Sequence, residues 1–391
     1  MQLRNVVILS ISQTMSISAA TIVVLVGGAI GSDLAPSPAW ATLPISILIV
    51  GVAVSVIPAV LIMKRIGRRS GFMIGAVVAG LGALLAAYAV ARGSFLLFCA
   101  GTLFIGVDGA FVQQYRFAAT ESVEPRYSGR ALSFVLLGSV LAGYVGPELV
   151  KRSKDWLTAG TYTGSFVSLG VLFAIVAAVM YFFKDVAPQK EEALGGERPL
   201  REIVTQPIYF VAVLAGAVSY AVMSFIMTAT PLYLLHTYSL EQTALVIQSH
   251  VIAMYLPFLF TAIVLERLGL LRVMVLGVLS MFASVILGVI GRDFIHLWGA
   301  LVLLGIGWNF VFVGATVLLT RSYLPAERFK AQAVNDFTIF GIQALGALSV
   351  GTVLFYANWD FLNLINLPLL LLTFVAILLL RTRMTSTPSK A

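Results

Sequence analysis

The sequence predicts an all-α integral membrane protein of twelve transmembrane helices in two six-helix bundles. Its 391 residues are 60% apolar and only 11% charged, with a mean hydropathy of +0.99, more than a soluble domain of this length requires. Apolar runs of about 18 residues or more recur along the chain, and each can cross a hydrocarbon core of roughly 30 Å as a helix. The runs also fall into two similar sets of six.

The predicted spans are delimited by charged residues and by Pro- and Gly-rich breaks. They are too long and too uniformly apolar for barrel strands, so we expect helices. The first run follows Arg4 and lacks a small-residue cleavage site, so we expect a first span rather than a signal peptide. The predicted spans are residues 5–31, 39–63, 71–91, 94–117, 130–150, 160–183, 207–235, 243–265, 272–291, 295–319, 332–356 and 361–380.

A polar stretch at 185–206, rich in Pro, Gly and Glu, separates the two sets of spans. It predicts a flexible cytoplasmic linker between an N-terminal bundle at 1–184 and a C-terminal bundle at 207–391. An internal repeat supports this division, because the Arg-x-Gly patterns that begin at Arg65 and Arg267 lie 202 residues apart, each after the second span of its half. Such parallel repeats predict alternating access about a site near the membrane midplane.

The basic residues predict the orientation. With a cytoplasmic N-terminus, five of the 25 Lys and Arg residues fall outside and the other 20 fall on cytoplasmic segments, as the positive-inside rule favours. Both termini are therefore expected in the cytoplasm. The net charge of +8 is a topology signal rather than a sign of nucleic-acid binding, and the five outer residues are Arg92, Lys151, Arg152, Lys154 and Arg292.

Several functional classes are excluded or disfavoured. The single cysteine, Cys99, excludes a disulfide framework and a thiolate metal cluster, and we expect it to be a small buried apolar residue. No phosphate-binding loop, zinc-protease helix or nucleophile elbow is present, so we expect neither an enzyme nor a nucleotide-driven pump. No permanently bound cofactor is expected.

The loop after the second span resembles that of the major facilitator superfamily, whose pattern is Gly-x-x-x-Asp-Arg-x-Gly-Arg-Arg. This chain keeps Arg65, Gly67 and Arg68-Arg69 but has Val60 and Lys64 at the Gly and Asp positions. The resemblance implies the twelve-helix major facilitator fold. It also implies an inner gate containing Arg65, Gly67 and Arg68, with Glu266 and Arg267 at the matching place in the second half. Span five resembles an antiporter Gly/Pro motif (Gly138, Gly143 to Pro147), although small residues there also permit tight helix packing.

Soft ligands occur at four-residue spacing on two neighbouring spans. Met223 and Met227 lie on one face of span seven, and His250 and Met254 on one face of span eight. Counting along the antiparallel helices places Met223 and His250 at similar depth, so three thioethers and an imidazole could converge. These neutral soft ligands suit Cu(I) better than Zn²⁺, Mg²⁺ or Ca²⁺. The alternative is helix packing for the Met pairs and a hydrogen-bonded packing role for the histidine.

The paired motifs resemble the CcoA-like copper importers, a bacterial branch of the superfamily that also includes riboflavin importers. The segments 113–119, 228–232, 307–310 and 335–337 are similar too, so the resemblance covers most of the chain. It implies copper binding by Met223, Met227, His250 and Met254, with copper as transported substrate rather than cofactor. It further implies a supply of copper for cytochrome oxidase assembly and a copper chaperone as partner.

Asp108 lies near the middle of span four, where an isolated carboxylate is strongly disfavoured. It is the leading candidate for proton coupling, with Arg116 two turns away, and a neighbouring helix that satisfies it structurally is the alternative. The adjoining polar block, Gln113, Gln114 and Tyr115, either lines a vestibule or bonds to the next loop.

Three polar residues of the second half complete the candidate set. Trp308 and Asn309 either contact substrate or bond between helices, and Trp308 suits flavin stacking. Asp336 begins span eleven, as an N-cap or a gate ion pair.

Three functions remain open at this stage. The leading one is a monomeric importer of copper in the bacterial inner membrane. The second is an importer of riboflavin or another small organic solute with the same fold. The third is a receptor that transports nothing. Coupling ion, direction of flux and substrate are left open by the sequence.

Overall fold

A computed structural model of the protein describes residues 3–124, 127–185, 198–324 and 327–386. The described residues are helical with connecting turns and contain no strand, and twelve of their helical segments are long and apolar enough to cross a membrane. The predicted fold class is therefore confirmed. Most of the predicted linker, residues 186–197, lies outside the described residues. The helices are α1 (Leu3–Leu34), η1 (Pro38–Trp40), α2 (Leu43–Ile66), α3 (Arg68–Arg92), α4 (Phe95–Val112), α5 (Tyr115–Glu121), α6 (Ser128–Ser153), α7 (Thr163–Met180), α8 (Leu200–Val204), α9 (Pro207–Leu235), α10 (Leu240–Tyr255), η3 (Leu256–Leu259), α11 (Thr261–Leu268), α12 (Leu270–Ile290), α13 (Phe294–Thr320), α14 (Arg328–Tyr356), α15 (Trp359–Leu364) and α16 (Leu367–Ser386).

Each predicted span overlaps one of these helical segments, with ends that differ by a few residues. Span eight begins at Leu240 rather than 243, because the Ser239 hydroxyl accepts a hydrogen bond from the Gln242 N–H and the Gln242 side chain caps the Ser239 N–H. Span four is interrupted at Gln113 and Gln114, which separate α4 from α5. This break lies beside the central cavity described below.

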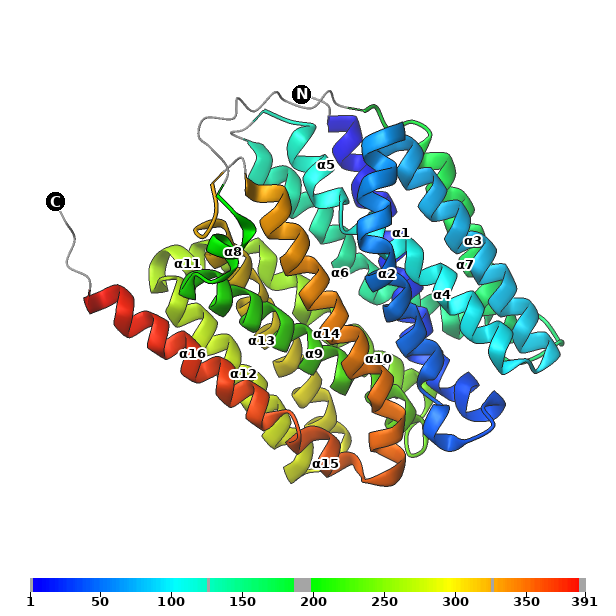
Figure 1. Ribbon diagram of the computed structural model, residues 1–391. Helices are drawn as coiled ribbons and strands as arrows, with labels where there is room; N and C mark the ends of the chain where they lie inside the picture. The colour runs from blue at the N-terminus through cyan, green and yellow to red at the C-terminus, as the bar shows by residue number, and fades with distance from the viewer. Residues whose placement is uncertain (1–2, 125–126, 186–197, 325–326, 387–391) are drawn as a thin grey trace.

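The two halves repeat one packing scheme (Figure 1). In the first half α3 packs on α4 and α7, and α4 also packs on α2; in the second half α12 packs on α13 and α16, and α13 also packs on α10. The pair α1–α6 corresponds in the same way to α9–α14. Gly67 and Gly269, which end the second span of each half, adopt matching positive φ angles of 87° and 84°. The predicted internal repeat is thus a repeat of structure.

Glycines allow some helices to touch backbone to backbone. A Cβ on Gly106 of α4 would overlap the carbonyl oxygen of Leu48 in α2, and a Cβ on Gly51 would overlap that of Leu103. In α6, Gly138 and Gly146 pack in the same way against the Ser10 and Ser18 carbonyls of α1. The small residues of span five therefore serve close helix packing, the second of the two roles considered for them.

The bundles meet mainly through α2 with α14 and α6 with α10. We call the end with loops 35–42 and 357–358 the outer end and the opposite end the inner end, after the predicted orientation. Toward the outer end the Ser46 hydroxyl donates to the Ala347 carbonyl at 2.5 Å. Toward the inner end, one ion pair between the bundles occurs among the described residues, Arg116 with Asp336 at 3.9 Å.

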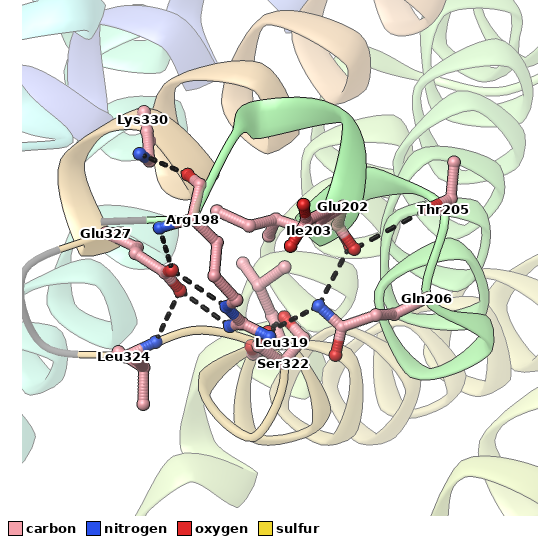
Figure 2. A network of polar contacts seen from close by, with 10 residues as sticks. All are labelled: Arg198, Glu202, Ile203, Thr205, Gln206, Leu319, Ser322, Leu324, Glu327 and Lys330. Atoms are coloured by element: carbon pink, nitrogen blue, oxygen red, sulfur yellow. Dashed lines mark hydrogen bonds and ion pairs between the residues drawn. The ribbon is translucent and has the colours of Figure 1, made fainter. Parts of the chain in front are cut away.

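The last residues of the predicted linker are attached to the second bundle (Figure 2). The Arg198 guanidinium donates to both carboxylate oxygens of Glu327, which is fully buried, and the Arg198 N–H donates to the same group at 2.8 Å. The Leu324 N–H is a further donor, and Lys330 Nζ donates to the Arg198 carbonyl. These contacts, led by the Arg198 side chain, lower the pKa of Glu327 to about 2. Residues 198–206 therefore pack with the second bundle rather than forming free linker.

Candidate functional site

A cavity of about 190 Å³ lies between the bundles at mid-depth. Helices α1, α2 and α4 line it from the first half, and α9, α10 and α14 line it from the second. Four of these six are repeat-related, since α1 and α9 are the first spans of their halves and α2 and α10 the second. A site shared by the two repeats near the midplane is the arrangement that alternating access requires.

Both bundles supply hydrogen-bonding groups that approach the cavity. Ser16 and Thr21 of α1 and Asp108 and Gln113 at the end of α4 are in its wall. In the second bundle Gln343 Nε2 donates to the Ser224 hydroxyl at 2.5 Å, and both side chains are also in the wall. Together with Thr228 and two tyrosine hydroxyls of the second bundle, these groups provide the directional contacts of a mostly apolar wall.

Three aromatic side chains of the second bundle face the cavity: Tyr220, Tyr255 and Phe340. Neither tyrosine hydroxyl has a hydrogen-bond partner among the described residues. Behind them Trp308 is 1% exposed, stacks on Phe312 at 5.0 Å, and meets the edges of both tyrosines at 5.1 and 6.0 Å. The tryptophan thus supports the aromatic wall from behind.

The predicted soft ligands reach the cavity only in part. Met223, Met227 and Met254 are all in its wall, so the three methionines border one cavity. His250 is fully buried outside the wall, where its Nδ1 lies 2.7 Å from the Leu301 carbonyl of α13. Its Nε2 has no partner among the described residues. The hydrogen bond to Leu301 matches the packing alternative considered for this histidine.

Asn309 and Trp308 lie outside the cavity wall. The Asn309 amide accepts from the Thr261 hydroxyl at 2.8 Å and donates to the Met254 carbonyl at 2.8 Å. These bonds join α13 to α10 and α11, so the structure shows the interhelical role. Of these aromatic side chains, Tyr220 and Tyr255 line the cavity and Trp308 does not.

The residues of the polar block at the end of span four, Gln113 to Tyr115, lie in three different environments. Gln113 is in the cavity wall, whereas the Gln114 carbonyl accepts from the Arg68 guanidinium at 3.3 Å. Tyr115 is fully buried, with its ring edge-on to Phe72 at 4.8 Å. Arg116 pairs with Asp336 and lies over the Phe117 ring at 4.7 Å. The arginine that we grouped with Asp108 for proton coupling therefore contacts a different carboxylate. Asp336 lies inside α14 and forms an ion pair rather than an N-cap.

The inner loop of the first half is held by an ion pair and a hydrogen bond within that half. Arg68 contacts Glu121 at 2.6 Å, and the Asp185 carboxylate accepts from the Arg69 N–H at 2.9 Å. Asp185 also lies against Gly67, where a Cβ would approach its oxygen to 2.6 Å. Asp185 thus packs against the loop that joins α2 to α3.

The other gate candidates lie in solvent at the inner end. Arg65, Glu266 and Arg267 are exposed, and none of them forms an ion pair with another described residue. Glu266, which we expected to take the role of the Asp that Lys64 replaces in the motif, thus has no ion-pair partner among the described residues. Of the predicted gate residues, Arg68 and Asp336 form ion pairs among the described residues.

The sequence reasoning missed several wall residues: Ser16, Thr21, Tyr220, Ser224, Thr228, Tyr255, Phe340 and Gln343. Hydroxyl and aromatic residues are common in membrane helices, so no single one of them is distinctive. Gln343 is an exception, because an amide in mid-span is costly and could have been selected by the criterion that selected Asp108.

Comparisons with known proteins agree with this architecture. The sequence profile of the Major Facilitator Superfamily matches residues 7–256 and 212–391. A "Riboflavin transporter RfnT" from Brucella anthropi is 39% identical over 379 residues, covering 96% of this chain and 95% of that protein. An uncharacterized MFS-type transporter of Bacillus subtilis, YddS, is 28% identical over 87% of this chain and 82% of its own length.

A solved structure shows the same fold at low sequence identity. A bacterial homologue of the human lysosomal transporter Spinster, in an inward-facing and unoccupied conformation, superposes with a TM-score of 0.74 at 13% identity, covering 99% of this chain and 98% of that one. The profile match and the 39% identical relative, together with the two repeated bundles around a central cavity, lead to one conclusion. The chain is a membrane transporter that belongs to the Major Facilitator Superfamily.

Proposed function

We propose that the protein takes up riboflavin, or a flavin close to it, across the bacterial inner membrane. The observation that carries the proposal is the 39% identity, over nearly the full length of both chains, with a protein named as a riboflavin transporter. The alternative of a small organic solute thus replaces copper as the leading substrate.

The chemistry of the cavity supports this choice. An isoalloxazine ring is flat, aromatic and edged with hydrogen-bonding groups, and the ribityl chain carries hydroxyls. Tyr220, Tyr255 and Phe340 offer ring surfaces, and Gln113 and the tyrosine hydroxyls offer polar contacts. A cavity of about 190 Å³ is smaller than the roughly 300–1,000 Å³ usual for drug-sized ligands. Flavin binding therefore requires further separation of the bundles, as alternating access entails.

The proposal is tested by expressing the full chain in a bacterium that cannot synthesise riboflavin and lacks its own importer. Growth on low external riboflavin and saturable uptake of labelled riboflavin are expected. Uptake no greater than that of the empty vector, from a protein shown to be present in the membrane, would overturn the proposal.

Copper uptake is retained as a second candidate, because Met223, Met227 and Met254 all line the cavity. Thioethers of this kind suit Cu(I). If copper is the cargo, Met227→Leu abolishes uptake of labelled copper; if a flavin is the cargo, the same conservative change alters riboflavin uptake only a few-fold, because volume-conserving apolar swaps are well tolerated. Met281→Leu, at a buried position outside the cavity wall, is the matched control.

A further inference from the structure

Four oxygen-bearing side chains at the junction of α1, α4 and α5 lack hydrogen-bond partners. They are buried, with exposed fractions of 0% for Ser12, 6% for Ser16, 1% for Asp108 and 0% for Tyr115. One oxygen of each has no partner among the described residues. Buried polar atoms are nearly always paired, so four orphaned oxygens around one junction require an explanation.

These groups are close together. The Ser16 side chain lies near enough to interact with both the Asp108 carboxyl and the Tyr115 hydroxyl, and Asp108 also acts electrostatically on Tyr115. Ser12 lies one turn from Ser16 on the same face of α1. The oxygens of Ser16, Asp108 and Tyr115 therefore lie close together, as oxygens that share a bound cation do.

The surroundings leave the carboxylate without a protein counter-charge. No basic side chain of the described residues acts on Asp108, because the one nearby, Arg116, is directed to Asp336 and to the Phe117 ring. On the α3 side the unpaired Oδ1 faces Gly75, where a Cβ would come to 3.2 Å. An ionised carboxylate in this position needs a bound cation to be stable.

The helix break adds a second favourable feature. Helix α4 ends at Val112, between Asp108 and Tyr115, and the carbonyl end of a helix is its negative pole. Discontinuous membrane helices whose carbonyl ends meet a coupling cation are a recurring construction in secondary transporters. Asp108 and Ser16 are also in the cavity wall, so an ion can reach the junction from the cavity.

We propose that Asp108, Ser16 and Tyr115, with Ser12 one turn away, form a binding site for a monovalent alkali cation such as Na⁺. One carboxylate balances one positive charge, whereas a divalent ion would leave a net charge in a low-dielectric site and would favour more carboxylates. The oxygen donors are hard ligands, which excludes Cu(I) from this position. A role in energising uptake rests on the proposed transport function, but the binding itself does not.

The test measures thermal unfolding of the full-length protein in detergent, without any flavin, in NaCl, KCl and choline chloride at equal ionic strength and constant pH. A saturable rise in Tm with Na⁺ and no rise with choline is expected, since a ligand that binds only the folded state stabilises it. Asp108→Asn should remove the rise, and Ser16→Ala and Tyr115→Phe should each raise the Na⁺ concentration at half effect by about tenfold.

Ser18→Ala is the matched control, because Ser18 is equally buried in α1 but already donates to the Thr14 carbonyl at 2.7 Å. It should keep the full Na⁺ response. If NaCl and choline chloride give the same Tm in the wild-type protein, or if acidification alone stabilises it while Na⁺ has no effect at any pH, the site binds no alkali cation and the proposal is overturned. The comparison of wild-type Tm in NaCl and in choline chloride does not depend on whether a variant folds. It also does not depend on whether the protein takes up riboflavin.

Discussion

Arg116 of α5 and Asp336 of α14 lie 3.9 Å apart and join the two bundles on the inner side of the cavity. Both side chains are mostly buried, so the contact is less screened than a surface ion pair. Because this ion pair joins one bundle to the other, its free energy affects how often the bundles separate at the inner end. We expect Arg116→Gln and Asp336→Asn each to increase labelling of a cysteine introduced at Gln113 and to change the rate of uptake.

A double-mutant cycle isolates this contact. If the pair acts as a gate, the Arg116→Gln/Asp336→Asn double variant opens little more than either single variant, with a coupling free energy of about 0.5–3 kcal/mol. Additive effects of the two substitutions would show that each residue acts through other contacts. Arg152→Gln, which breaks an ion pair with Glu148 inside the first bundle, is the control.

The Arg198–Glu327 contact predicts a dependence of stability on pH. The folded-state pKa of Glu327 is about 2, below its ordinary value of 4.5. The contribution to stability is therefore fully present above about pH 5 and is lost as pH falls from 4.5 toward 2. The Tm difference between the wild-type protein and Glu327→Gln should be constant at neutral pH and shrink in acid. A difference that does not change over this interval contradicts the assigned contact.

The aromatic wall predicts the energetics of flavin recognition. Replacing Tyr255 or Phe340 by alanine removes ring surface from the cavity, and stacking on an aromatic side chain contributes about 1–3 kcal/mol. We expect the riboflavin Kd, measured by quenching of flavin fluorescence, to rise about 5- to 150-fold. Phe282→Ala, whose ring contacts Phe374 between α12 and α16, should leave it unchanged. Equal losses at all three positions would indicate general destabilisation.

The glycine contacts predict contrasting effects on stability. Gly106→Ala places a methyl group against the Leu48 carbonyl and forces α2 and α4 apart, so Tm should fall. Gly346→Ala in α14 meets no atom within 4 Å and gains helix propensity, so Tm should hold or rise slightly. A fall at Gly346 as large as that at Gly106 would show that the effect is not steric.

The sequence predicted the membrane spans well because lipid imposes a strict length and apolarity on every crossing helix. It could not locate helix ends, since these depend on local contacts such as the Ser239–Gln242 capping box. Residues 198–206 were likewise assigned to the linker. The contact that attaches them to the second bundle, Arg198 with Glu327, joins residues 129 positions apart. A contact at that separation leaves no local pattern.

The candidate site was predicted in part. Four-residue spacing identified the Met faces of α9 and α10, and Met223, Met227 and Met254 all border the cavity. Spacing does not reveal how far a helix is rotated, so His250 was expected in the cavity and instead contacts Leu301. Similarly, Arg116 was grouped with Asp108 on its own span, whereas its partner lies on the opposite bundle.

The most direct test of the account is parallel uptake of labelled riboflavin and labelled copper by one preparation of proteoliposomes containing the purified full-length protein. The account predicts saturable riboflavin accumulation that unlabelled riboflavin competes away and that Tyr255→Ala weakens, with copper at the level of empty liposomes. Copper accumulation that Met227→Leu abolishes, with riboflavin at the level of empty liposomes, would contradict it.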